Sequence, residues 1–169
     1  DNLVAYLKKI NPDVKVKTSS HIRDIKEADF IITATNAPEA VVTSDDLKSG
    51  AVIIDDAQPS DVSPEVFDRD DVIAVEGGLI YTPDIKNHFN MGLKDRFDNF
   101  SCMGEIMALA AHEHNQNYVI DRPSLEHIDE ISSMAKKMGI RLSEFQNAKE
   151  KISKEKIAHV DSIIKNNVK

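Results

Sequence analysis

A single cysteine, Cys102, carries the most nucleophilic side chain of this sequence, and it lies in the segment NFSCMGEIMALAAHEH, residues 99–114. Asp98, Asn99 and Ser101 are residue types preferred at helix N-termini, so we expect Cys102 in a first helical turn. Free backbone N–H groups and the positive end of the helix dipole favour a thiolate there, and the same N–H groups could stabilise an oxyanion. The position therefore indicates a nucleophile, although a free cysteine is also often a buried and inert core residue.

Tyrosine and histidine side chains on either side of this segment could transfer protons. Tyr81 and His88 follow a glycine pair and are candidate acids for a developing oxygen anion. His112 and His114 are two residues apart and so point to different faces of a helix, whereas zinc-binding helices carry histidines four apart. We therefore predict no metal site and assign this histidine pair to a solvated helix end.

Composition argues against several classes of function. The chain has 169 residues, of which 41% are hydrophobic and 30% charged, enough for one domain with a core. Its net charge of −8 argues against nucleic-acid binding, which favours basic patches. No apolar run approaches the roughly 20 residues of a membrane span, and the first residues read as an amphipathic helix and not as a signal peptide. One cysteine cannot form an internal disulfide, so we predict a cytoplasmic protein.

Short apolar runs in the first part of the chain predict buried strands. They occupy residues 30–32, 51–54 and 72–75, and short helical signals lie between them. Buried strands that alternate with short helices are typical of a parallel α/β sheet. The predicted fold class is therefore α/β, with a partial Rossmann-like parallel sheet in residues 1–97.

The second part of the chain predicts helices. Strand signals disappear after residue 97, and helical patterns follow over about 101–117, over about 123–139, and from Ser143 onward. We expect residues 98–169 to form a C-terminal helical segment that packs on the sheet. Its apolar stripe of Met and Ile side chains is interpreted as core or as a homodimer interface.

Ligands of parallel α/β sheets bind beyond the carboxyl ends of the strands, where this sequence carries small and polar residues. The three segments are TATNAP (33–38), DDAQPSD (55–61) and EGGLIYTP (76–83). Together they indicate a nucleotide-type site, although a GxGxxG phosphate turn is absent. Either the chain holds no dinucleotide domain or it begins after that turn, and a start on a helix at Asp1 favours the second reading.

The order of these motifs resembles the reductase domain of long-chain acyl-(acyl carrier protein) reductases. The resemblance runs through ADFIITATNAPEAVVTSDDLKSGAVIIDDAQPSDV, VIAVEGGLI and NFSCMGEIMALA and covers roughly residues 1–145. It implies a Rossmann-type NADPH domain that reduces a fatty acyl thioester, carried by acyl carrier protein or CoA, to an aldehyde. Asp55-Asp56-Ala57 departs from the family, which is glycine-rich there.

The resemblance also implies roles for individual residues. Cys102 matches the cysteine that takes the acyl group as an enzyme thioester. The positions that match cofactor contacts are Thr35, Asn36, Gly77 and Gly78. Residues 1–97 would then be a partial NAD(P)-binding domain whose first strand and glycine turn lie upstream, so we expect the isolated chain to bind NADPH poorly and to be inactive.

Two alternatives stay open at this point. One is an NAD(P)-dependent small-molecule dehydrogenase, similar to shikimate or amino-acid dehydrogenases, in which Cys102 is structural. The other is a non-catalytic Rossmann-like module that binds a partner through its last helix.

Overall fold

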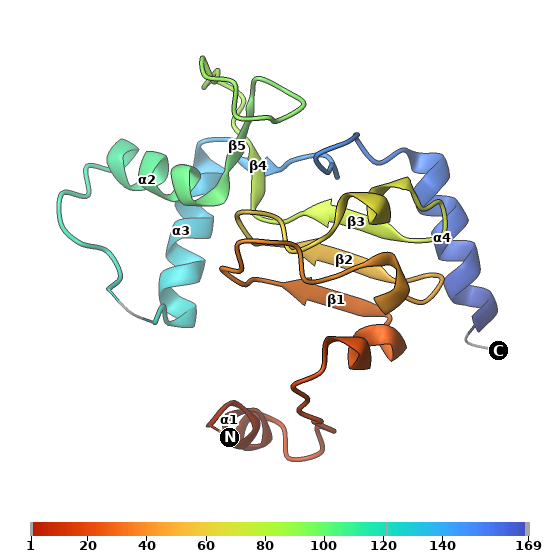
Figure 1. Ribbon diagram of the computed structural model, residues 1–169. Helices are drawn as coiled ribbons and strands as arrows, with labels where there is room; N and C mark the ends of the chain where they lie inside the picture. Colours follow the sequence, from red (N-terminus) through yellow and green to blue (C-terminus); the bar gives the residue numbers. More distant parts are fainter. Residues whose placement is uncertain (1, 121, 168–169) are drawn as a thin grey trace.

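The computed structural model describes residues 2–120 and 122–167 and shows a mixed α/β architecture (Figure 1). Within these two ranges, no helix combines the length and the apolar character that crossing a bilayer requires. Three strands form the centre, two helices lie beyond one end of them, and a last helix covers one face.

The central sheet is parallel and three-stranded. Strands β1 (Phe30–Thr33), β2 (Val52–Asp55) and β3 (Ile73–Glu76) lie in the order β1-β2-β3 and pair in register without bulges. Their carboxyl ends therefore meet at one edge of the sheet. The predicted α/β class and the partial Rossmann-like sheet are confirmed.

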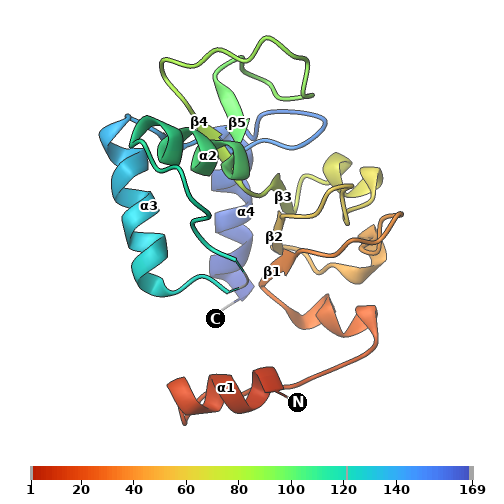
Figure 2. The same ribbon diagram turned by 90° about the vertical axis from the view of Figure 1, so that its left-hand side faces the viewer.

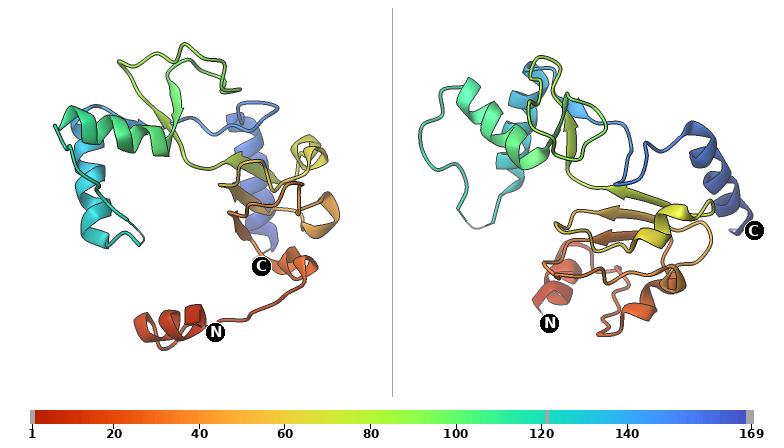
Figure 3. Two further views of the ribbon diagram at one scale, coloured as in Figure 1. Left: turned by 60° about the vertical axis from the view of Figure 1, so that its left-hand side comes forward. Right: turned by 45° about the horizontal axis from the view of Figure 1, so that its top comes forward.

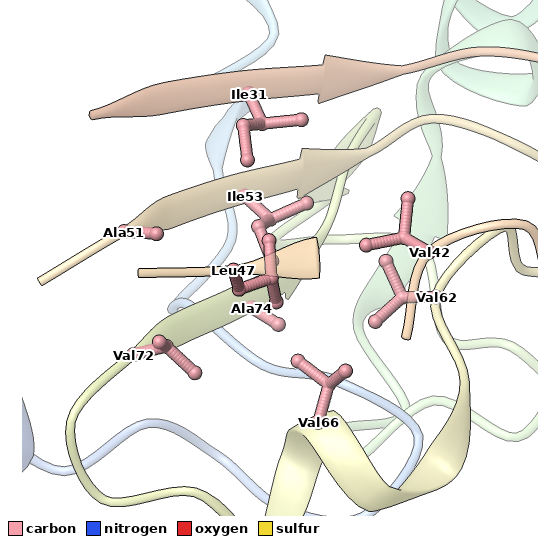
Figure 4. Packing of buried hydrophobic residues seen from close by; sticks show 9 residues of the cluster. All are labelled: Ile31, Val42, Leu47, Ala51, Ile53, Val62, Val66, Val72 and Ala74. Carbon is pink, nitrogen blue, oxygen red and sulfur yellow. The ribbon is translucent and has the colours of Figure 1, made fainter. Parts of the chain in front are cut away.

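One face of the sheet is covered by connections that contain short 3₁₀ helices. These are η1 (Ile22–Glu27), η2 (Ser44–Asp46) and η3 (Pro64–Asp68). Aliphatic side chains, most of them small or β-branched, fill the space beneath them, which suits short strands that pack closely on both faces. The cluster consists of Ile31, Val42, Leu47, Ala51, Ile53, Val62, Val66, Val72 and Ala74 (Figure 4).

The opposite face is covered in part by α4 (Lys154–Asn167). Val160, which has no exposed surface, packs with Ile73 and Val75 of β3. Val52 and Ile54 of β2 are only partly buried against this cluster. The helix thus protects the β3 side of the sheet and leaves the β1 side of the same face open.

The helix predicted from Ser143 begins eleven residues later, because polar side chains fix the preceding segment as an irregular connection. The Asn147 amide donates to the Ala74 carbonyl oxygen at 3.0 Å. The Gln146 side-chain amide donates to Asp98 Oδ2 at 2.7 Å, and the Gln146 backbone carbonyl oxygen accepts from the Glu76 N–H at 2.8 Å. Both side chains are buried, so this segment links β3 to Asp98.

A second, antiparallel sheet follows β3. It consists of β4 (Leu79–Tyr81) between β5 (Asp98–Phe100) and β6 (Arg141–Leu142). The prediction that strands end before residue 97 was wrong, because β5 and β6 are two or three residues long and form only through pairing with the distant β4.

Two helices extend from this second sheet. The first, α2 (Ser101–Ala111), lies on β4. The second, α3 (Leu125–Lys137), packs against α2 (Figure 3). A Cβ atom on Gly104 would collide with the side chain of Ile80, so glycine permits the close approach of α2 to β4. Helix α2 is shorter than the helix predicted over about 101–117 and ends at Ala111.

The first helix of the chain stands apart. Helix α1 (Asn2–Ile10) is joined to η1 by an extended arm and lies below the sheet without extended packing on another described element (Figure 2).

Candidate functional site

Cys102 lies in the first turn of α2, as predicted, and its side chain is exposed. The N-cap residue is Phe100 and not one of the polar residues proposed from the sequence. Asp98 and Asn99 instead belong to β5, where their buried side chains hold the strand in place. Phe100 offers no side-chain oxygen to the helix start, and the Ser101 N–H donates to the Gly78 carbonyl oxygen at 2.6 Å.

A cavity of about 410 Å³ brings Cys102 together with the predicted glycine pair. Its walls come from the carboxyl ends of β2 and β3 and from the start of α2. The lining residues are Asp56, Gln58, Gly77, Gly78, Phe100, Ser101 and Cys102. Residues from three separate segments of the sequence thus surround one thiol.

The glycine pair shapes this cavity by letting backbone segments approach closely. A Cβ on Gly77 would lie 3.0 Å from Ile54 Cγ2, and one on Gly78 would lie 2.8 Å from Asp56 Oδ1 and 3.1 Å from Ser101 Oγ. Gly78 also has a φ of +64°, which favours glycine. Gly78 therefore needs glycine for the turn between β3 and β4, and a side chain at Gly77 would crowd Ile54.

Thr35 and Asn36 lie outside this cavity. The Thr35 N–H and hydroxyl donate to the two carboxylate oxygens of Asp61, at 2.9 and 2.5 Å, and the hydroxyl accepts from the Ala37 N–H at 3.1 Å. The Thr35 side chain is thus engaged in holding its own turn, and Asn36 is exposed.

The sequence did not reveal how the Asp55 side chain organises the β2 end. Asp55 is buried, and its carboxylate accepts from the Thr33 hydroxyl at 2.8 Å and the Ser60 hydroxyl at 2.6 Å. The backbone N–H groups of Ala57 and Asp61 donate to the same carboxylate at 3.2 and 3.1 Å. The segment 55–61 is therefore folded around one carboxylate.

The same edge carries a concentration of negative charge. Asp55 and Asp61 are buried there, Asp56 lines the cavity, and Glu76 ends β3. Burial raises the pKa of Glu76, with a smaller contribution from Asp55, while the Gln58 amide donates to the Glu76 carboxylate at 2.8 Å and lowers it. A pyrophosphate at this edge would face several carboxylates.

Tyr81 and His88 are not brought to the thiol. The Arg141 guanidinium carbon lies 3.8 Å from the centroid of the Tyr81 ring. The Tyr81 and Phe97 rings are tilted by 41° to each other, and their centroids are 5.6 Å apart. Tyr81 lines a different cavity, which includes Asp98 and Arg141. His88 is exposed in the connection between β4 and β5.

Comparison with known proteins gives one distant relative of interest. No protein-family model matches the chain. Aminotransferase PigE of Serratia sp. (strain ATCC 39006) is 24% identical over 152 residues, which cover 86% of this chain and 18% of that protein. The chain therefore spans less than a fifth of its relative's length and is similar to part of an enzyme.

These findings correct three expectations. The assignment to acyl-(acyl carrier protein) reductases was wrong, since the similarity found is to an aminotransferase. The oxidoreductase class was wrong for the same reason, because an aminotransferase is a transferase. NADPH as cofactor was also wrong; the acidic strand ends and the engaged Thr35 give the physical reason.

Proposed function

We propose that this chain is an α/β domain of an enzyme in which Cys102 accepts an acyl group from a thioester. The observation that carries the proposal is the exposed thiol in the first turn of α2, facing a cavity of about 410 Å³ beside Gly77 and Gly78. The donor is a thioester of CoA or of acyl carrier protein, which present the same reacting group. A cytoplasmic location is part of the proposal, since that compartment keeps a lone thiol reduced.

The chemistry is a transthioesterification. The Cys102 sulfur, as thiolate, forms a bond to the acyl carbonyl carbon, the carbon–sulfur bond to the carrier breaks, and the carrier leaves as a thiol after taking up a proton. The N–H groups of Cys102 and Met103 have no partner within the helix because they belong to its first turn. With Phe100 as N-cap, they are free of a side-chain cap and can donate to the oxyanion.

Glycine and small side chains leave room for the carbonyl group. A side chain at Gly78 would meet Asp56 and Ser101, which line the cavity, so the cavity depends on this glycine. Asp56 is the charged side chain that lines the same cavity.

The amine-transfer chemistry named for the relative does not fit this cavity. Aminotransferases hold pyridoxal phosphate through a Schiff base with a lysine. The residues that line the cavity include no lysine, and its charged side chain is an aspartate. We therefore assign no step of amine transfer to these residues.

The test is the intact mass of the protein after incubation with an acyl-CoA. We expect a mass gain of one acyl group and one equivalent of free CoA, both lost in Cys102→Ser. Because any exposed thiol reacts slowly with thioesters, the rate is compared with that of glutathione at the same thiol concentration, and Cys102 should be at least tenfold faster. His88→Ala is the control and should acylate normally. A rate equal to that of glutathione, in folded protein, would reject the proposal and favour a binding module.

A further inference from the structure

A second cavity, of about 390 Å³, lies between α2, α3 and the connection that joins them. Its walls come from one stretch of the chain, residues 105–132, in which α3 packs on α2 and the connection runs along one side of α3 (Figures 1 and 2). It shares no lining residue with the cavity of Cys102. Cavities of about 300–1,000 Å³ are usual for small-molecule sites, so this one has the volume to hold a ligand.

One wall of this cavity is aromatic and is fixed by hydrogen bonds. The Tyr118 hydroxyl donates to Glu130 Oε2 at 2.7 Å, and the His127 carbonyl oxygen lies 3.1 Å away. The Tyr118 ring makes edge contacts with the rings of His114 and His127, at centroid distances of 5.3 and 5.4 Å. The Ser124 N–H donates to His127 Nδ1 at 3.2 Å, so the His127 ring is neutral in this arrangement.

The polar side of the cavity is negative. Glu105 of α2 lines it, and the Glu130 carboxylate binds the Tyr118 hydroxyl. Burial raises the pKa of Tyr118 to about 12, and the hydrogen bond to Glu130 and the charges of Glu130 and Glu105 add to the shift. The hydroxyl therefore stays neutral and keeps lone pairs that can accept a hydrogen bond. Among the residues that the structure describes, no lysine or arginine lines this cavity.

The other walls are mostly apolar. Val119 and Pro123 come from the connection, and Ile128 and Ile131 come from α3. Ile128 is 50% exposed, so an apolar group that covers it would remove hydrocarbon surface from water. The cavity thus combines a negative end with an apolar body.

We propose that this cavity binds a primary amine, whose ammonium group contacts Glu105 and the Tyr118 hydroxyl and whose apolar body covers Ile128. An ammonium group donates three hydrogen bonds and accepts none, which suits a carboxylate beside a hydroxyl oxygen. The faces of aromatic rings also attract cations. A ligand carboxylate would instead meet the like charges of Glu105 and Glu130.

The test is a titration of isotope-labelled protein with phenethylammonium, followed through the amide signals in two-dimensional NMR. The buffer is phosphate, because Tris is itself a primary amine. We expect the shifted signals to come from residues around the cavity. Phenethylammonium should bind about tenfold more tightly than phenethyl alcohol or phenylpropionate, which carry the same phenyl body without a positive charge.

Three results of this titration would overturn the proposal. The first is equal affinity for the amine and the alcohol, which would mean that the negative end recognises nothing. The second is a set of shifts spread over the whole acidic surface of the chain. The third is the absence of shifts at about 10 mM amine.

Two matched variants separate the cavity from the net charge of the chain. Glu105→Gln should weaken the binding of phenethylammonium by about fivefold. Glu39→Gln is the same change at an exposed glutamate between β1 and β2 and should leave binding unchanged. Glu105 is also exposed, so both variants should keep the amide spectrum of the folded parent. Equal affinities of the two variants would overturn the proposal.

The amine site and the proposed acyl transfer can fail separately. The cavity between α2 and α3 does not include Cys102, so Cys102→Ser should bind phenethylammonium as the parent does. A loss of amine binding in Cys102→Ser would overturn the assignment of the amine to this cavity.

Discussion

Replacing Asp55 by asparagine should destabilise the protein strongly, although the two side chains have the same shape. One carboxylate oxygen of Asp55 accepts from the Thr33 hydroxyl and the Ala57 N–H, and the other accepts from the Ser60 hydroxyl and the Asp61 N–H. In either orientation, the asparagine NH₂ group would face a backbone N–H. A hydroxyl can rotate to accept a hydrogen bond, but a backbone N–H cannot.

The magnitude follows from these contacts. A hydrogen bond to a charged group contributes about 1.5–3 kcal/mol, and a buried donor left without a partner costs about 1–3 kcal/mol. Burying a neutral amide in place of a carboxylate recovers part of this cost. We therefore expect Asp55→Asn to lower the free energy of unfolding by about 3 kcal/mol.

The neighbouring residue provides a matched control. Asp56→Asn is the same chemical change at an exposed side chain and should alter stability by less than about 0.5 kcal/mol. Because the chain has no tryptophan, urea unfolding is followed by far-ultraviolet circular dichroism. If the two variants unfolded at the same urea concentration, the Asp55 carboxylate would not organise the segment 55–61 as described.

Two further outcomes follow from charges near the sheet. Hydrogen bonds from Arg69 lower the pKa of Asp71 from 3.8 to about 2, so the pair stabilises the fold above pH 4 and loses that contribution as pH falls through 2. With Asp71 34% exposed, we expect Asp71→Asn to be about 1 kcal/mol less stable than the parent at pH 6 and equal to it below pH 2. Burial raises the pKa of Glu76, so ionisation weakens the fold as pH rises past that pKa; Glu76→Gln should stabilise at pH 7 and be neutral below pH 4, as a melting series would show.

The central sheet could be predicted from the sequence because its signal is local. Each strand is a continuous apolar run, and three such runs separated by short helices permit few arrangements. The placement of Gly77 and Gly78 beside the end of β2 could be predicted in the same way, since strand ends in a parallel sheet gather at one edge. The position of Cys102 depends instead on the antiparallel pairing of β5 with β4.

The remaining features depend on partners that are distant in the sequence. The family resemblance implies a cofactor contact at Thr35, but the Thr35 hydroxyl donates to Asp61, 26 residues away. The sequence makes Tyr81 a candidate proton donor. Strand alternation turns its side chain away from that of Ile80, which packs under α2, and the Arg141 guanidinium covers the Tyr81 ring. Neither partner follows from spacing or composition.

The buried pair Gln146 and Asn147 has a consequence for the order of folding. The Gln146 side chain donates a hydrogen bond to Asp98, three residues before α2 begins. The Asn147 side chain donates to a backbone carbonyl of β3. These contacts join residues 48 and 73 positions apart, so the loops they close form late. During synthesis, the start of α2 would stay loosely placed until the chain beyond residue 147 has left the ribosome. Chains truncated before that point would carry Cys102 without the surroundings that position it.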